Sequence, residues 1–245
     1  AGPQATMNSV QDVHCFGSSD GSASVLLNGG TAPFNYSWTG STQNTSSIAN
    51  LPAGTYSVFI TDANNCSTSV PFTISQPSPL TSSVISTNVN CFGGNTGSAI
   101  ITGSGGTGPY QFKWMHDLST NPTANNLTAG TYQAIVTDAN GCSSSSSVTI
   151  SQPSALTLST SSLPSYCDNN TGSVEATVTG GVSPYNYLWT PGNNNSPSVY
   201  NLSAGTYNAI ITDANGCTMT ASTTVIGYSA PNAVVSSSAN VGCNG

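Results

Sequence analysis

Hydrophobic and polar residues alternate over short stretches of this chain, which is the period of a β-strand. In the first third, Phe34, Tyr36 and Trp38 occupy alternate positions, and the same alternation returns at residues 56–60. Alternate residues of a strand point to the same side, so each stretch predicts a strand with one apolar face turned to a core. No stretch keeps the 3.6-residue period of a helix over several turns. The pattern therefore predicts an all-β chain.

Turn residues separate these predicted strands at regular intervals. GSASVLLNGG at residues 21–30 predicts a strand that begins at a glycine and ends at Gly-Gly. TDANN at 61–65 has the Asp and Asn chemistry of a hairpin turn. Short antiparallel strands with such spacing predict a sandwich. A strand-borne Trp38 followed by Gly-Thr-Tyr at 54–56 fits an immunoglobulin-like layout, in which the tyrosine forms a corner near the start of a late strand.

The whole pattern is written three times, which predicts a tandem array. AGTYSVFITDANNC at 53–66 returns with small changes as AGTYQAIVTDANGC at 129–142 and as AGTYNAIITDANGC at 204–217. The expected β-sandwich repeats are residues 1–78, 79–154 and 155–230, and residues 231–245 match the start of a fourth repeat that is cut short. The linkers carry prolines, which favours semi-rigid joints. The expected fold is a tandem array of small immunoglobulin-like antiparallel β-sandwiches.

Recurrent aromatic residues are expected to fill the cores. Their strict alternation and fixed place in each repeat favour packing over sugar binding by stacking. These residues are Trp38, Trp114, Trp189, Tyr56, Tyr132 and Tyr207.

The seven cysteines follow the repeat, with two in each full repeat and Cys243 at the start of the fourth. Pairing within repeats would stabilise small extracellular domains by about 4 kcal/mol each in the chain-entropy model. An immunoglobulin layout opposes this pairing, because it places the two cysteines of one repeat at opposite poles, and bridged Cα atoms lie within about 7 Å. Free thiols or bridges between repeats are the alternative. The pairs expected within repeats are Cys15–Cys66, Cys91–Cys142 and Cys167–Cys217.

Charge is scarce, with one Lys+Arg against eight Asp+Glu and a net charge of −7. The lone basic residue, Lys113, argues against nucleic-acid binding, which needs several cations to displace counterions. No apolar run approaches the roughly 20 residues of a membrane-spanning helix, so no direct membrane insertion is expected.

The residues do not assemble into a catalytic or cofactor site, and the chain is not expected to be an enzyme. One acidic residue recurs in each repeat: Asp62, Asp138 and Asp213. Each is a weak calcium candidate, since calcium takes six to eight oxygens and usually several carboxylates. The stronger interpretation is a hairpin Asp that accepts backbone N–H bonds. No cofactor or other metal is expected.

One stretch, CFGGNTGSAIITGSGGTGPYQFKW followed by AGTYQAIVTDANGCSSSSSVTISQPS, resembles the SprB repeat of large cell-surface adhesins of gliding Bacteroidetes. The matching elements come in order: Cys-x-Gly, Gly-Ser, Pro-aromatic, Trp, A-G-T-Y and T-D-A-N-G-C. The second half of each repeat also resembles PKD-type surface domains. The resemblance covers essentially the whole chain. It implies an extracellular surface protein exported by the type IX system and used in attachment or gliding.

The expected function is structural, as spacer or stalk repeats of an extracellular adhesin or surface filament. Each repeat would add roughly 35–45 Å of length at about 3.3 Å per strand residue. The alternative is an array of polysaccharide-binding modules on the cell surface. The expected partners are neighbouring repeats, surface glycans or other copies of the chain.

Overall fold

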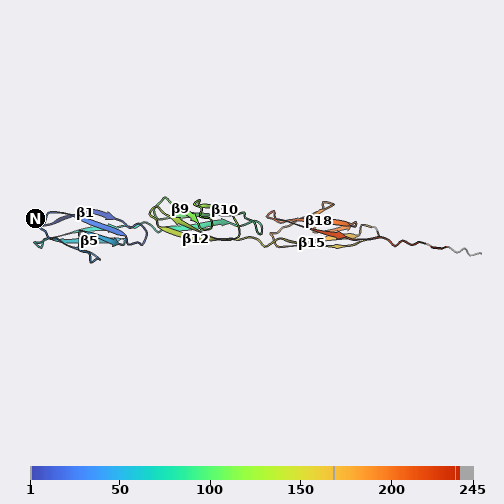
Figure 1. The fold of residues 1–245 in the computed structure, drawn as a ribbon, viewed down its shortest axis with the longest axis horizontal. Helices are drawn as coiled ribbons and strands as arrows, with labels where there is room; N and C mark the ends of the chain where they lie inside the picture. The colour runs from blue at the N-terminus through green and yellow to red at the C-terminus, as the bar shows by residue number, and fades with distance from the viewer. Residues whose placement is uncertain (1, 168, 235, 238–245) are drawn as a thin grey trace, which may run out of the picture. The chain divides into compact units, whose positions relative to one another are not determined.

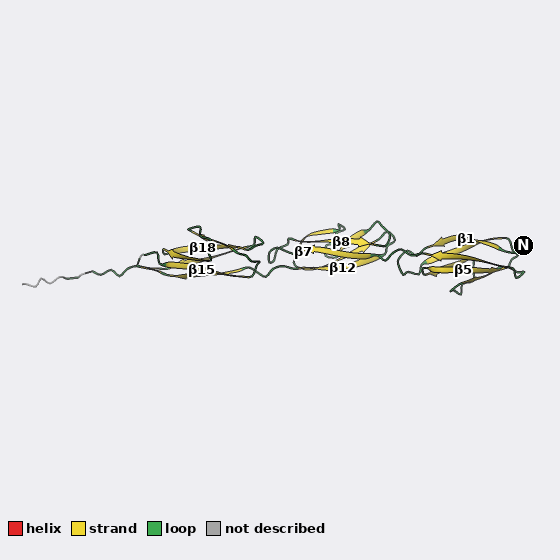
Figure 2. Cartoon of the chain, turned by 180° about the vertical axis from the view of Figure 1, so that it is seen from behind, coloured by secondary structure: helices red, strands yellow, loops and turns green. Residues whose placement is uncertain are grey.

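A computed structural model describes residues 2–167, 169–234 and 236–237. These residues form strands and loops with no helix among them (Figures 1 and 2). In particular, they include no helix long and apolar enough to cross a membrane. The predicted all-β fold is confirmed.

The first repeat folds as two three-stranded antiparallel sheets. One sheet has the order β1-β2-β4 and the other β3-β5-β6. The strands are β1 (Gln4–Gln11), β2 (Gly21–Asn28), β3 (Asn35–Trp38), β4 (Ser47–Leu51), β5 (Gly54–Thr61) and β6 (Ser67–Ile74). Alternate residues of both sheets meet in one core, as the period of two predicts.

The second repeat has the same strand sequence, with sheets in the order β10-β8-β7 and β12-β11-β9. Its strands are β7 (Thr81–Thr87), β8 (Gly97–Ser104), β9 (Gln111–Trp114), β10 (Thr123–Leu127), β11 (Gly130–Thr137) and β12 (Ser143–Ile150). β12 is SSSSSVTI, with little apolar surface of its own. Its serines serve as hydrogen-bonding groups instead, because Ser144 and Ser146 bond the Ser82 hydroxyl of β7 at 3.0 and 2.8 Å.

The third repeat keeps the two sheets, β13-β15-β17 and β16-β18-β19, and adds a short parallel pair, β14-β20. Its strands are β13 (Thr157–Leu163), β14 (Ser165–Tyr166), β15 (Gly172–Thr179), β16 (Asn186–Thr190), β17 (Ser198–Leu202), β18 (Gly205–Thr212), β19 (Thr218–Val225) and β20 (Gly227–Tyr228). The strands of all three repeats form tandem β-sandwiches of the immunoglobulin-like class.

The chain divides into two compact units that do not coincide with the repeats. The first contains residues 1–87, 98–125 and 130–149, and the second contains 88–97, 126–129 and 150–245. The repeat boundaries drawn from the sequence therefore stay a prediction. Most of the expected fourth repeat, with Cys243, lies outside the described residues.

The recurrent tryptophans lie in the cores. Trp38, Trp114 and Trp189 are each at most 3% exposed. In the first repeat, the Trp38 ring meets Phe72 edge-on with centroids 5.7 Å apart, and Tyr56 stacks on Phe72 at 5.5 Å. Edge-on and offset contacts suit the charge distribution of aromatic rings.

The recurrent tyrosines of the G-T-Y motif lie beside these cores. The Tyr56 hydroxyl donates to the Pro52 carbonyl at 2.8 Å, and the Tyr207 hydroxyl donates to the Ser203 carbonyl at 3.1 Å. A bond to a carbonyl four residues upstream is the geometry of a tyrosine corner. Tyr132 is half-buried at the same place of the second repeat.

A glycine begins β2, β8 and β15, the equivalent strands of the three repeats, because the backbone there is crowded. A Cβ added to Gly97 would lie 2.7 Å from the Leu127 carbonyl oxygen and 2.8 Å from an Ile150 methyl. Gly21 and Gly172 are enclosed in the same way. The Gly-Ser motif that follows each first cysteine is thus a packing requirement of the sandwich.

Candidate functional site

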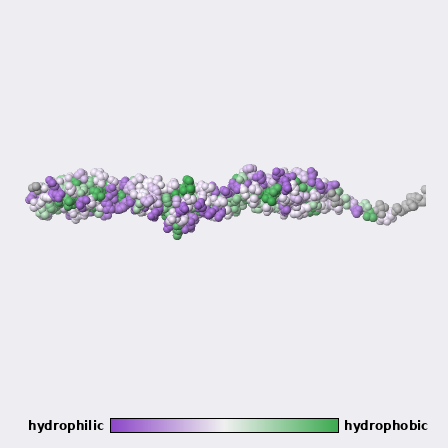
Figure 3. Space-filling view, turned by 90° about the horizontal axis from the view of Figure 1, so that it is seen from above, coloured by the Kyte–Doolittle hydropathy of each residue, from purple (hydrophilic) through white to green (hydrophobic). Residues whose placement is uncertain are grey.

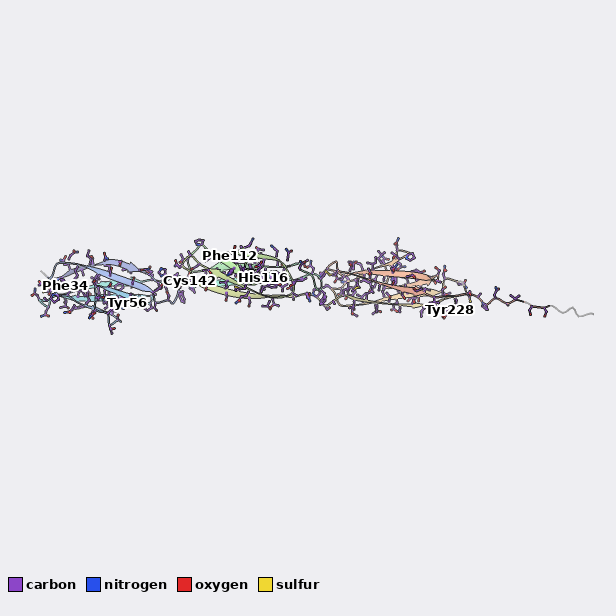
Figure 4. The ribbon with its side chains drawn as sticks, viewed as in Figure 1. Phe34, Tyr56, Phe112, His116, Cys142 and Tyr228 are labelled. Atoms are coloured by element: carbon purple, nitrogen blue, oxygen red, sulfur yellow. A yellow bond between two sulfur atoms is a disulfide. The ribbon has the colours of Figure 1, made fainter. Side chains whose placement is uncertain are left out.

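Two disulfides join consecutive repeats, and they are the recurrent feature on which the site is built. Cys15 of the first repeat bonds Cys142 of the second, with Cα atoms 5.7 Å apart. Cys91 of the second repeat bonds Cys217 of the third, with Cα atoms 5.8 Å apart. Cys142 lies in the turn between β11 and β12 and is labelled in Figure 4.

This pairing corrects the one expected from the sequence. The pairs Cys15–Cys66, Cys91–Cys142 and Cys167–Cys217 do not form, and Cys66 and Cys167 are exposed free thiols. The pairing between repeats, which was the alternative, is what the structure shows.

The physical reason is the length of the sandwich. The loop with Cys15 is tied to the exit of its own repeat, because the Val13 N–H donates to the Ser75 carbonyl at 3.2 Å. The turn that carries Cys66 is tied to Thr31, which follows the far end of β2. β2 runs between these two ends with eight residues. A strand of that length spans about 25 Å, far beyond the reach of a disulfide.

An aspartate shapes the turn that carries each second cysteine. In the second repeat, Asp138 accepts backbone N–H bonds from Thr107, Asn140 and Cys142, each at 2.9 Å. Asp62 and Asp213 make the equivalent three bonds in their repeats. The carboxylate oxygens are therefore occupied by the turn itself. The described residues contain no group of three or more His, Cys, Asp or Glu that would hold a metal ion.

These hydrogen bonds favour the ionised form of the aspartates. The Thr107 N–H is the main cause that lowers the pKa of Asp138 below its ordinary value, and burial acts against it. For Asp62 and Asp213, burial is the largest single influence and raises the pKa. The combined backbone N–H bonds outweigh burial, so the pKa of both groups is also lowered.

An asparagine in the same turn contacts the preceding repeat. The Asn140 Nδ2 donates to the His14 carbonyl at 2.9 Å, and the Asn215 Nδ2 donates to the Asn90 carbonyl at 2.8 Å. Each accepting carbonyl belongs to the residue just before a bridged cysteine. Sequence reasoning missed this role, although the asparagine recurs in every T-D-A-N motif.

The loop that carries each first cysteine is held from two sides. In the second repeat, the Asn90 N–H donates to the Thr96 hydroxyl at 2.9 Å, and the Gly93 N–H donates to the Gln152 side chain at 2.7 Å. The first repeat has Asp20 and Gln76 at these places. Gln76 and Gln152 are the Gln of the I-S-Q-P-S linkers, so the linker shapes the cysteine loop.

Asp20 is the most strongly perturbed of the acidic groups at these joints. The hydroxyl of Ser18 and then the ring of His14 bond its carboxylate, and together they lower the pKa of Asp20 to about 2. Thr96 and Thr171 stand in its place in the other repeats, so a carboxylate is not required there.

The third repeat departs from this arrangement, in keeping with its shorter loop and its different exit linker. The Tyr166 and Tyr228 rings stack with centroids 5.3 Å apart, and the Cys167 N–H donates to the Tyr228 carbonyl at 2.7 Å. Cys167 itself has a positive φ of 55°. Gly227 stands where the other two linkers have glutamine, and the neighbouring Tyr228 contacts the cysteine loop.

The linker also docks on the repeat that follows it. The Gly106 N–H donates to the Ser78 carbonyl at 2.9 Å, and the Gly181 N–H donates to the Ser154 carbonyl at 3.0 Å. A Cβ on Gly180 would lie against the Ala155 carbonyl oxygen. Each pair of consecutive repeats is therefore attached at two places, the docked linker and the disulfide.

The face of the chain shown in Figure 3 is mostly polar, with scattered apolar side chains. Two of the exposed apolar residues recur beside the bridges, Phe16 at 54% and Phe92 at 58% exposure. Phe92 borders a shallow hollow of about 460 Å³ that Leu156 and Met219 also line. Phe59 is 53% exposed, whereas Ile135 and Ile210 at the same place of the other repeats are half-buried.

Several solved structures of tandem extracellular domains are similar to this chain at low identity. An eight-immunoglobulin-domain fragment of Down Syndrome Cell Adhesion Molecule (DSCAM) matches 87% of this chain and 34% of its own at 14% identity, with a TM-score of 0.35. Domains 1–6 of the surface layer protein SbsC match 93% of this chain and 40% of their own at 12% identity, with a TM-score of 0.30.

A C-terminal fragment of intimin, solved with the intimin-binding domain of its translocated receptor, matches 63% of this chain and 65% of its own. The identity is 11% and the TM-score 0.33. Of the DSCAM fragment named above, this chain spans about a third of the length. No curated protein sequence matches the chain.

A family model gives a specific assignment. The SprB repeat matches residues 7–43, 83–116 and 160–194. Each matched segment contains a first cysteine and a core tryptophan, and the second cysteines lie outside the matched segments. Three segments of the chain therefore match the SprB repeat, and each spans the first part of one β-sandwich.

Proposed function

We propose that the chain is a spacer segment of an extracellular bacterial adhesin or surface filament, in which consecutive repeats are covalently joined. The observation that carries this proposal is the staggered disulfide, which links the first cysteine of one repeat to the second cysteine of the next. A bridge within a repeat would stabilise that repeat alone. A bridge between repeats instead holds two consecutive repeats together.

Two attachments limit the motion of one repeat against the next. A single linker allows bending and twisting about one point, even when it contains proline. A second covalent point removes much of that freedom. In the chain-entropy model, closing a loop of this length raises the free energy of the unfolded chain by about 5 kcal/mol. Stiff joints are what a spacer needs if length is to increase with repeat number.

Disulfides also support an extracellular location, because they persist in oxidising compartments and are rare in the cytosol. The SprB resemblance adds export by the type IX system and a role in attachment and gliding. We include both in the proposed function.

Small-angle scattering of the full chain tests the spacer role. Three repeats of about 35–45 Å in a row give a radius of gyration of roughly 35 Å, and one compact body of this size gives roughly 18 Å. We expect the larger value under oxidising conditions and a broader distance distribution after reduction. A radius close to the compact value would overturn the spacer role.

Polysaccharide binding is the second candidate function, and the exposed Phe16 and Phe92 favour it. Exposed aromatic rings are suited to stacking on sugars, and Phe92 also borders a shallow hollow. A glycan array probed with the full chain and with the double variant Phe16→Ser/Phe92→Ser tests this candidate. Binding that the double variant loses would support it, and equal signals from both proteins would remove it.

A further inference from the structure

The turn in each bridged joint contains the dipeptide Asn-Gly. Asn140-Gly141 directly precedes the bridged Cys142, and Asn215-Gly216 directly precedes the bridged Cys217. Asparagine is a thermolabile side chain. It is most labile before glycine, because glycine has no side chain to hinder attack by its backbone nitrogen on the amide. Both asparagines are exposed to water, so each joint carries a group prone to deamidation beside its disulfide.

The closed joint holds the two groups that deamidation must bring together. The Gly141 N–H donates to the Asp138 carbonyl at 3.1 Å. The Asn140 Nδ2 donates to the His14 carbonyl at 2.9 Å and to the Thr107 hydroxyl at 3.2 Å. Attack by the Gly141 nitrogen on the side-chain carbonyl carbon of Asn140 requires both groups to turn, and it therefore breaks these hydrogen bonds.

The second joint repeats this arrangement. The Gly216 N–H donates to the Asp213 carbonyl at 3.0 Å, and the Asn215 Nδ2 donates to the Asn90 carbonyl at 2.8 Å. In both joints the carbonyl that accepts from the asparagine belongs to the residue just before a bridged cysteine. The disulfide thus keeps this acceptor beside the asparagine, and reduction of the disulfide frees it.

We infer that Asn140 and Asn215 are deamidation sites that the bridged joint protects, and that their reaction after reduction prevents the joint from closing again. This inference rests on the disulfide joint, which also carries the proposed function, but it does not depend on the length of the array.

The chemistry needs a reductant to open the joint and water to complete the modification. A dithiol supplies two electrons and two protons to the disulfide and becomes a cyclic disulfide itself. The glycine nitrogen then bonds the side-chain carbonyl carbon of the asparagine, whose bond to Nδ2 breaks. Ammonia leaves with the proton of the glycine N–H, which gives a succinimide. Water opens this ring at either carbonyl, and the product is aspartate or isoaspartate.

Neither product restores the contact across the joint. The aspartate product has only acceptor oxygens at position 140, where Asn140 has a donor, and the His14 carbonyl opposite is also an acceptor. The isoaspartate product adds one carbon to the backbone before Gly141. That carbon alters the turn in which the Cys142 N–H donates to the Asp138 carboxylate at 2.9 Å. An open joint therefore re-forms its disulfide less readily as deamidation proceeds.

Peptide mapping of the full chain tests the protection. The protein carries Cys66→Ser, Cys167→Ser and Cys243→Ser, which leave only the cysteines of the two bridged pairs. It is incubated at mildly alkaline pH with and without dithiothreitol. Mass spectrometry of its chymotryptic peptides then follows the conversion of each asparagine.

We expect Asn140 and Asn215 to deamidate several-fold faster with the reductant. Asn28 is the internal control, because it also precedes a glycine but ends β2, away from the bridged cysteines. Its rate should not change. Equal rates at Asn140 and Asn215 in the two conditions would overturn the protection. The same acceleration at Asn28 would also overturn it, because the effect would then not be specific to the joints.

The variant Asn140→Asp in the same background tests the consequence. The reduced protein is equilibrated in a glutathione redox buffer and alkylated, and the fraction with the Cys15–Cys142 bond is measured. We expect an equilibrium constant for this bond several-fold lower than in the parent protein. Asn64→Asp is the matched control, because Asn64 occupies the same turn position and its Nδ2 donates to Thr31 within its own repeat. It should leave the bond unchanged.

An unchanged Cys15–Cys142 equilibrium in Asn140→Asp, or an equal loss in Asn64→Asp, would overturn the inference. These outcomes are independent of the scattering experiment. A compact radius of gyration would remove the spacer role alone, and the protection of the asparagines would still be decided by the peptide map.

Discussion

At the residue scale, the recurrent aspartate is the residue whose function the structure defines most closely. It combines a buried position with three backbone N–H donors, so its charge is satisfied within one turn. The cysteine two residues after the recurrent asparagine is thereby fixed in place. These contacts agree with the interpretation that the sequence favoured, a hairpin aspartate that accepts backbone N–H bonds.

Acid should therefore destabilise the repeats. The pKa of Asp138 is lowered in the folded protein, so the ionised carboxylate stabilises the fold above the unfolded pKa of about 3.9, and that stabilisation is lost as the pH falls through the folded value. We expect Asp138→Asn to lower Tm by several degrees at pH 7 and to flatten the fall in Tm below pH 4. Thermal unfolding between pH 7 and pH 2 measures both effects, with the exposed Glu175→Gln as control. An identical acid profile for the Asp138→Asn variant and the parent protein would contradict this.

At the element scale, the tyrosine corner connects a strand to the segment that precedes it. The Tyr56 hydroxyl bonds the Pro52 carbonyl at the start of β5, which fixes how the chain enters this strand. The same corner closes at Tyr207 in β18. In these two sandwiches the corner forms within one repeat and does not depend on the bridges.

Removing the corner hydroxyl should cost the first repeat about 1 kcal/mol, the usual net value of one hydrogen bond. Tyr56→Phe keeps the ring that stacks on Phe72, so only the hydroxyl contact is lost. Urea unfolding of this variant measures the change. Tyr36→Phe is the matched control, since no hydrogen bond of the Tyr36 hydroxyl is seen among the described residues. Equal free energies of unfolding for the two variants would show that the corner bond does not stabilise the fold.

Strands and cores were predictable from the sequence because they depend on local alternation. Trp38, Trp114 and Trp189 lie in cores because a period of two places them on the inward face, whatever the neighbouring repeat does. Disulfide pairing depends instead on which ends of two sandwiches meet, and residue spacing carries no such information. The immunoglobulin layout argued against a Cys15–Cys66 bridge, because it places these two cysteines at opposite poles of the sandwich. It did not identify Cys142 as the partner of Cys15.

At the scale of the whole molecule, each bridge spans the linker between two repeats, and cutting one linker tests this arrangement. A site for a specific protease, inserted between Pro77 and Ser78, would divide the chain into two fragments. The Cys15–Cys142 bond spans this position, so the cut protein should migrate as one species without reductant and as two with it. Adding Cys142→Ser should release the fragments without reductant. Separation of the parent protein without reductant would show that the bridges lie within repeats.

The overlap of the two bridges affects how the chain withstands proteolytic cleavage outside the cell. Every peptide bond between Cys15 and Cys217 is spanned by at least one bridge, and those between Cys91 and Cys142 are spanned by both. A single proteolytic nick anywhere in that interval leaves one covalent molecule. Bridges confined to single repeats would leave each linker as a point where one cut sheds everything beyond it. An array with overlapping bridges tolerates isolated damage, and only several cuts or a reductant can release its outer part.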